Sequence, residues 1–138
     1  MKPRVLLTSF PEFGGHDENI SKKIMLAFES TGIEGITLET ELLTCDEDGS
    51  RRVSNLIEQG EKYDAIIQLG LADSRKEISL ERWAHNYSNF TIPDNSERMA
   101  DEIIIEGGPD KYQATVSKHV FDEEFENDED VVWSHSAG

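Results

Sequence analysis

The chain has 138 residues, a length suited to one domain with a single core; 36% of its residues are hydrophobic and 30% are charged. Its 29 acidic and 13 basic residues give a formal net charge of −16, which excludes nucleic acid and anionic membrane surfaces as main partners because phosphates would be repelled. Acidic surfaces also occur in proteins from salt-rich habitats. The single cysteine, Cys45, excludes an internal disulfide framework and a multi-thiolate zinc site.

No apolar run approaches the roughly eighteen residues that span a bilayer, so no membrane segment is expected. The apolar stretch after Arg4 is too short for the core of a secretory signal. These features favour a cytoplasmic protein.

The first half of the chain predicts strands alternating with helices. Strands are predicted at residues 5–10, 36–43 and 63–70 from apolar or alternating runs. Helical spacing of apolar residues predicts one helix from Ile20 to Phe28, capped by Asn19 or Ser21 and ended by Gly32, and another around Val53, Leu56 and Ile57, ended by Gly60. This order is typical of a parallel sheet covered by helices. Such sheets bind ligands beyond the carboxyl ends of their strands, which points to the loops after Phe10 and Leu69.

The second half is less regular. Turns are indicated at residues 93–95 and 107–109, a third helix at Val116, Val120 and Phe121, and a strand at residues 131–134. Seven of the nine residues from Asp122 to Asp130 are acidic, which indicates a solvated helix end and loop, or alternatively a metal-binding loop. The spacing does not match an EF-hand.

The loop after the first strand, Phe10-Pro11-Glu12-Phe13-Gly14-Gly15, has two phenylalanines three residues apart. They would either present flat apolar surface to a small planar ligand or pack in the core. The glycines match neither nucleotide-binding pattern, Gly-x-x-x-x-Gly-Lys or Gly-x-Gly-x-x-Gly.

A second candidate is the segment Glu81-Arg82-Trp83-Ala84-His85-Asn86, which follows Arg75. Glu81 would either orient a histidine base, as in a nucleophilic triad, or form a surface ion pair. His85 and His135 have no companion at metal-ligand spacing, so each is expected to be structural or solvated. Cys45 is followed by three acidic residues, which discourage a thiolate.

Together these segments resemble the pyroglutamyl peptidase I family, also called pyrrolidone-carboxylate peptidases. Residues 5–15 are similar to the family's V-L-x-T-G-F-x-P-F-G-G, with Ser9 in place of a glycine and Pro11-Glu12 reversing the acidic–proline order. Asn19 matches the family's asparagine, although Ile20 replaces the usual proline. Residues 70–86 resemble G-x-A-x-x-R-x-x-I-x-x-E-R-x-A-x-N, residues 92–95 match I-P-D-N, and residues 134–138 resemble S-N-S-A-G, with His135 in place of the asparagine.

The resemblance implies a three-layer α/β/α sandwich with a mostly parallel central sheet. It implies a cysteine peptidase that removes N-terminal pyroglutamate from peptides with a Cys-His-Glu triad and no metal or cofactor. Glu81 corresponds to the catalytic glutamate, Phe10 and Phe13 to the aromatic residues that sandwich the lactam, and Asn19, Leu71 and Arg75 to positions that bind substrate or support the site.

In the family the nucleophilic cysteine lies about four residues beyond S-A-G, at a helix N-terminus that favours a thiolate, and the histidine lies later still. Residues 1–138 are therefore expected to be a single incomplete domain that lacks the C-terminal strand and helices and is inactive alone. An enzyme fragment is the favoured interpretation; the alternative is a non-catalytic relative that binds pyroglutamate or another partner. A homo-oligomer or a complementing chain is an expected partner, because an incomplete sheet exposes apolar surface.

Overall fold

A computed structural model describes residues 1–15, 17–90 and 92–135. The chain divides into two compact units, each described by itself. The sheet unit comprises Met1–Leu71 with Thr91–Met99, and the hairpin unit comprises Ala72–Phe90 with Ala100–Gly138. No helix in the described ranges is long and apolar enough to cross a membrane. A single domain over residues 1–138 stays a prediction.

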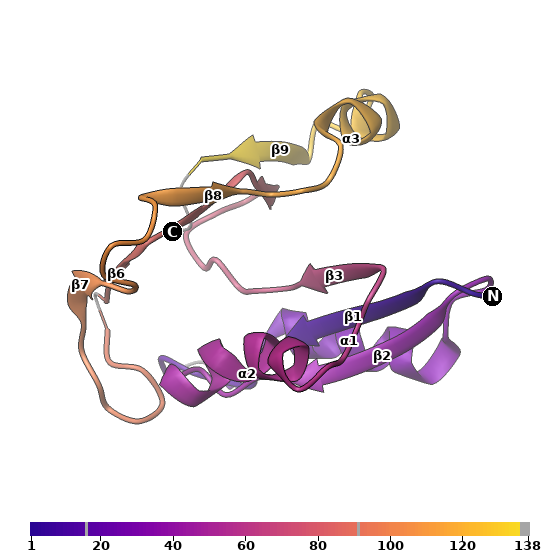
Figure 1. Ribbon diagram of the computed structural model, residues 1–138. Coiled ribbons are helices and arrows are strands. Elements are labelled where there is room, and N and C mark those ends of the chain that lie inside the picture. The colour runs from indigo at the N-terminus through magenta and orange to yellow at the C-terminus, as the bar shows by residue number, and fades with distance from the viewer. Residues whose placement is uncertain (16, 91, 136–138) are drawn as a thin grey trace. The chain divides into compact units, whose positions relative to one another are not determined.

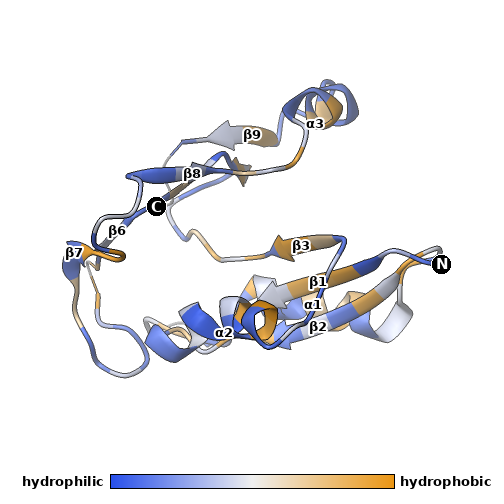
Figure 2. Cartoon of the chain, in the orientation of Figure 1, coloured by the Kyte–Doolittle hydropathy of each residue, from blue (hydrophilic) through white to orange (hydrophobic). Residues whose placement is uncertain are grey.

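The sheet unit is built on three parallel strands, β1 (Arg4–Ser9), β2 (Thr37–Leu42) and β3 (Ala65–Gln68), in the order β2-β1-β3. This confirms the predicted parallel sheet. The central strand β1 is the most deeply buried, from Val5 to Ser9. Both β1 and β3 are largely apolar (Figure 2). The core of this unit is small: Leu6 and Leu7 are joined by Met25, Leu43 and Leu56.

Two helices cover this sheet, α1 (Ile20–Thr31) and α2 (Glu47–Glu58). The predicted cap is confirmed, because the Asn19 side chain accepts from the Ser21 N–H, and Gly32 ends α1 with φ at 65°. The connection from β1 to β2 runs one way across the sheet, and the connection from β2 to β3 runs back. Right-handed crossovers then put α1 and α2 on opposite faces, as Figure 1 shows. The reversal leaves a topological switch point between β1 and β3.

The amino end of the sheet is closed by ion pairs. The Arg4 guanidinium contacts the carboxylates of Glu39 and Glu61 and lies 4.5 Å from the centre of the Tyr63 ring. Arg4 therefore ties β1 to β2 and to the segment that enters β3.

The described residues of the hairpin unit form three strand pairs and one helix. The strand β4 (Ile78–Glu81) pairs in parallel with β9 (Val131–Ser134). The antiparallel pairs are β5 (Trp83–His85) with β8 (Lys111–Gln113), and β6 (Tyr87–Asn89) with β7 (Asp101–Ile103). The strand predicted at residues 131–134 is confirmed. The strands β4 to β8 were not predicted: β5 to β8 have only three residues each, and β4, ISLE, lacks the continuous apolar run that indicates β3 and β9.

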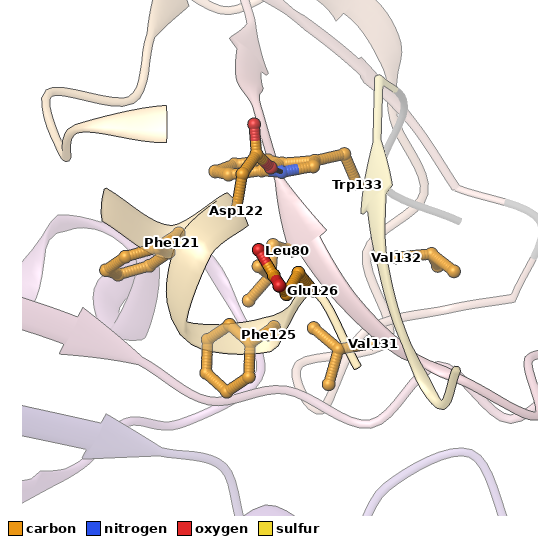
Figure 3. A pocket seen from close by; sticks show the side chains of 8 residues that line it. All are labelled: Leu80, Phe121, Asp122, Phe125, Glu126, Val131, Val132 and Trp133. Atoms are coloured by element: carbon orange, nitrogen blue, oxygen red, sulfur yellow. Dashed lines mark hydrogen bonds between the residues drawn. The ribbon is translucent and has the colours of Figure 1, made fainter. Parts of the chain in front are cut away.

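The helix α3 (Lys118–Phe125) packs against the β4–β9 pair. The prediction that Val116 belongs to this helix is wrong, because the Ser117 side chain caps it after Val116. Phe121 stacks on Trp133, whose indole N–H donates to Asp122 at 2.7 Å. A cavity of about 280 Å³ lies beside these rings (Figure 3). The acidic residues after α3 are exposed, and the described residues include no cluster of three or more side chains suited to a metal ion.

Candidate functional site

The loops that follow β1 and β3 lie side by side at the switch point. The Leu69 N–H donates to the Thr8 carbonyl at 2.9 Å, which extends the β1–β3 pairing to the ends of both strands. A Cβ added at Gly70 would lie 4.0 Å from Cε2 of Phe10, so the Phe10 ring is directly next to the Gly70 backbone. The loops that the sequence singled out are therefore brought together.

Asn19 and Ser21 anchor the Phe10 loop, residues 10–15 after β1, through hydrogen bonds. Asn19 is only 1% exposed; its Nδ2 donates to the Pro11 carbonyl at 3.1 Å, and its Oδ1 accepts from the Ser21 hydroxyl at 2.6 Å. The Phe10 N–H donates to the Ser21 Oγ at 3.2 Å. Both ends of the Asn19 amide are thus used inside the protein, which makes Asn19 a support of the loop. Ser21, considered from the sequence only as a cap, also supports it.

The other two predicted site residues of the sheet unit are half-buried. Phe13 lies in the loop after Phe10, and Leu71 follows Gly70. Partial exposure leaves part of each side chain available to a ligand. It also leaves the alternative of core packing open for Phe13.

Cys45 is placed unfavourably for a nucleophile. Burial raises the pKa of its thiol, and the charges of Asp94 and Asp46 raise it further. Asp94 belongs to residues 92–99, which lie against Cys45: the Asn95 N–H donates to the Cys45 carbonyl at 2.7 Å. The effect of Asp46 agrees with the sequence interpretation. The contribution of Asp94 could not be found by local reasoning, because it comes from a distant part of the chain.

Glu81 lies at the carboxyl end of β4. Its Oε1 accepts from the Arg75 Nη1 at 2.5 Å, so the two predicted residues of the hairpin unit form an ion pair. The Glu81 side chain is 37% exposed. In the parallel register Glu81 is beside Ser134 of β9, and the Arg82 N–H donates to the Ser134 carbonyl at 2.8 Å. Glu81 therefore lies beside the carboxyl end of β9.

The histidines make contacts that sequence reasoning missed. The His85 Nε2 lies 2.7 Å from the His135 carbonyl oxygen, and the Trp83 indole N–H donates to the His135 Nδ1 at 3.1 Å. His119 pairs with Glu123 on an exposed turn of α3. His16 and the last three residues of the Ser134–Gly138 motif lie outside the described residues.

Asn86, the last residue of the second motif, also has a structural use. Its Nδ2 donates to the Ile105 carbonyl and its Oδ1 accepts from the Ile105 N–H, each at 2.8 Å. The side chain thus makes the two backbone hydrogen bonds that a paired strand residue would make, and these bonds fix the loop before β8. Asn86 is a support, like Asn19.

The six predicted site residues fall into two groups. Phe10, Phe13, Asn19 and Leu71 belong to the sheet unit, where the carboxyl ends of β1 and β3 bring Phe10 and the Leu69–Leu71 turn together. The other group, Arg75 and Glu81, belongs to the hairpin unit and is joined by its ion pair. One group offers apolar surface and the other a carboxylate.

Comparisons with known proteins agree on one family. The family model described as pyroglutamyl peptidase matches residues 3–129. The chain is 33% identical over 116 residues to the pyrrolidone-carboxylate peptidase of Coprothermobacter proteolyticus, covering 82% of this chain and 55% of that protein. It is 37% identical over 114 residues to the enzyme of the same name from Vibrio parahaemolyticus, covering 79% and 52%. The chain spans about half the length of the curated relatives it matches.

Solved structures show the same likeness. The pyrrolidone carboxyl peptidase of Fervidobacterium islandicum AW-1 matches with a TM-score of 0.89 and 31% identity, covering 99% of this chain and 67% of that one. The enzyme from Thermococcus litoralis matches with a TM-score of 0.86 and 30% identity, covering 100% and 63%. The parallel sheet with helices therefore belongs to an α/β fold that these peptidases share.

Proposed function

Because the chain belongs to the pyroglutamyl peptidase family, we propose that residues 1–138 supply the lactam-binding loops and the orienting carboxylate of a peptidase that removes N-terminal pyroglutamate from peptides. The observation that carries the proposal is the Phe10 ring against Gly70 at the β1–β3 switch point. A ring held on a strand-end loop offers a flat apolar face where α/β sheets receive ligands.

In this proposal Phe10 and Phe13 contact the lactam ring from the loop after β1, and Leu71 completes the surface from the loop after β3. A five-membered lactam is flat and has two polar atoms, so apolar faces with nearby backbone groups suit it. Asn19 keeps the loop in place through its bonds to the Pro11 carbonyl and to Ser21. Preorganisation of this kind lowers the entropy lost on binding.

Glu81 takes the role of the triad carboxylate, which orients a histidine base and stabilises its charged form. The bond from Arg75 supports this role because it fixes the direction of the Glu81 carboxylate. Acyl transfer also needs a thiolate nucleophile and an imidazole base. In the resemblance both follow the S-A-G motif and have no counterpart among residues 1–138, so in this proposal these residues do not hydrolyse pyroglutamyl peptides by themselves.

The same proposal covers location and partners. A reactive thiol is kept reduced in the cytoplasm, which suits a cytoplasmic cysteine peptidase. Ile78 on β4 is 63% exposed and Ile67 on β3 is 50% exposed. Apolar side chains on open strands favour association with a second copy or a complementing chain. Neither metal nor cofactor has a part in the proposed chemistry.

Binding and turnover are tested separately. Titrating the 138-residue chain with a pyroglutamyl amide should produce saturable shifts in the amide signals of Leu69, Gly70 and Leu71, and proline amide, which lacks the lactam carbonyl, should produce much smaller ones. Phe10→Leu should weaken binding, whereas Phe28→Leu, a matched change at an exposed position of α1, should not. Saturable binding that is unchanged in Phe10→Leu, or no binding at all, would refute the pocket.

Turnover is measured as release of a chromophore from a pyroglutamyl amide. No thiol-dependent release is expected. Release by the parent chain that is lost in Cys45→Ser would contradict the proposal, because it would make Cys45 a nucleophile. Binding without release is also what a non-catalytic pyroglutamate-binding relative would show. Joining the chain to the C-terminal part of a relative distinguishes that alternative, since only the peptidase proposal expects activity to appear and to be lost in Glu81→Gln.

A further inference from the structure

Two side chains of β5 form hydrogen bonds with His135, the residue that follows β9. Trp83 and His85 are two residues apart and therefore lie on the same face of β5. The Trp83 indole N–H donates to the His135 ring at Nδ1, and the His85 ring donates to the His135 carbonyl. His135 is thus held by its side chain and its backbone at once.

The partners determine whether the ring nitrogen in each contact donates or accepts a hydrogen bond. An indole N–H is only a donor, so the His135 Nδ1 must be the unprotonated nitrogen and its proton must be on Nε2. A carbonyl is only an acceptor, so the His85 Nε2 carries the proton that it donates. The Trp83 ring is itself oriented by Lys111, whose Nζ lies 4.2 Å from the ring centre. The arrangement is specific in direction as well as in distance.

His135 directly follows the part of β9 that pairs with Glu81, so a contact that holds His135 also holds the end of β9. Glu81 and Ser134 are neighbours in the parallel register, and the bond from the Arg82 N–H to the Ser134 carbonyl is made at the end of that pairing. His135 is the next residue, where the chain leaves β9. Movement of the backbone there would shift the end of β9 that pairs with Glu81 and Arg82.

We propose that Trp83 and His85 are positioning residues that fix the backbone at His135 and thereby the exit of β9 beside Glu81. The inference rests on the proposed function for the role of Glu81. Both residues occupy positions that the E-R-x-A-x-N pattern leaves open, and His135 stands where the S-N-S-A-G pattern has asparagine. The Oδ1 of an asparagine is attached to Cγ just as the Nδ1 of histidine is, so it is an equivalent acceptor for the indole.

The first test is the tautomer of His135 in the 138-residue chain. Two-bond proton–nitrogen correlation spectra of the histidine rings at neutral pH should show the Nε2–H form for His135, with Nδ1 shifted by hydrogen bonding. Trp83→Phe should remove that shift without changing the backbone spectrum of the sheet unit. A His135 ring in the Nδ1–H form, or one whose signals do not respond to Trp83→Phe, would overturn the proposal.

The second test is hydrogen exchange of the Arg82 amide, which bonds to Ser134. His135→Leu removes the acceptor of the indole and should speed Arg82 exchange about fivefold, as expected for one hydrogen bond. His135→Asn keeps an acceptor and should stay within about twofold of the parent rate. The Leu69 amide, in the sheet unit, is the control and should not change in either variant.

Equal effects of leucine and asparagine, or equal acceleration at Arg82 and Leu69, would refute a positioning role and indicate general destabilisation. Neither test uses substrate. A failure of the lactam pocket would therefore leave the tautomer and the exchange rates as expected, and a failure of the Trp83–His135 contact would leave pyroglutamyl amide binding unchanged.

Discussion

Asn19 is a single side chain with two tasks. Its Oδ1 accepts from the Ser21 N–H at 3.0 Å and caps α1, while its Nδ2 donates to the Pro11 carbonyl and anchors the Phe10 loop. A buried amide that is satisfied at both ends is costly to replace, because each lost partner leaves a polar group without a bond. The start of α1 and the shape of the candidate pocket therefore depend on one residue.

Two substitutions separate these tasks. Serine caps helices about as well as asparagine but is too short to bond to the Pro11 carbonyl. Alanine can neither cap the helix nor make that bond. Asn19→Ala should lower the free energy of unfolding by about 2 kcal/mol, and Asn19→Ser by about half of that. Urea denaturation measures both values. Equal losses in the two variants would mean that the cap contributes nothing to stability.

At this scale the sequence shows the cap but not the anchor. Asn19 stands immediately before the apolar spacing of α1, which is a local pattern. The bond to Pro11 depends on how the loop returns over the helix, and the raised pKa of Cys45 depends in part on Asp94, far along the chain. The hydrogen bonds of Trp83 and His85 to His135 also join residues that are far apart in the sequence. Such pairings follow from the fold and leave no local pattern.

The first turn of α2 lies very close to the chain that leads into it. The helix begins at Glu47, and the Asp46 side chain caps it by accepting from the Gly49 N–H at 2.9 Å. The backbone of Thr44, two residues before the cap, lies so close that a Cβ at Gly49 would be 1.6 Å from the Thr44 carbonyl oxygen. Glycine is therefore required at this helical position for lack of space.

Gly49→Ala tests this reason directly. In an ordinary helix the change would stabilise by up to about 1 kcal/mol, because alanine is the better helix former. Here the added methyl group meets backbone, so the free energy of unfolding should fall by roughly 1–3 kcal/mol. Ser50→Ala, at the next and exposed position, is the control and should change it by less than about 0.5 kcal/mol. Thermal denaturation of the two variants decides the sign, and a stabilised Gly49→Ala would contradict the close approach.

At the scale of elements, length decides what the sequence can predict. The six-residue strands β1 and β2 and the twelve-residue helices α1 and α2 each complete their hydrophobic period, so local patterns reveal them. The strands β5 to β8 have three residues each and pair with partners that are distant in sequence. Their existence is a consequence of tertiary pairing, which single-sequence periodicity does not contain.

The whole molecule is dominated by negative charge. A net charge of −16 on 138 residues repels itself in the folded state more than in the expanded one, which lowers stability. Some carboxylates are compensated: the pKa of Asp94 is lowered by the N–H groups and guanidinium around it, and that of Asp46 by Thr44 and Gly49. The surplus of acidic over basic residues leaves most of the repulsion in place.

Salt should therefore stabilise this chain at pH 7. Raising KCl from about 0.1 M to about 1 M shortens the Debye length from about 10 Å to about 3 Å, which screens the repulsion. A gain of about 1 kcal/mol would raise Tm by roughly 3–6 °C for a chain of this size. Differential scanning calorimetry at both concentrations measures the shift.

The control for this effect is the same salt series near pH 4.5, the isoelectric point of the sequence. The lowered pKa values of Asp46 and Asp94 mean that their stabilisation is complete above the ordinary aspartate pKa of 3.8 and is lost only as the pH falls through the lower folded values. The chain therefore keeps these contacts near pH 4.5 while its net charge is close to zero. The salt-induced rise in Tm should vanish there. A rise of the same size at both pH values would assign the effect to general salting-out of apolar surface, and the self-repulsion argument would be wrong.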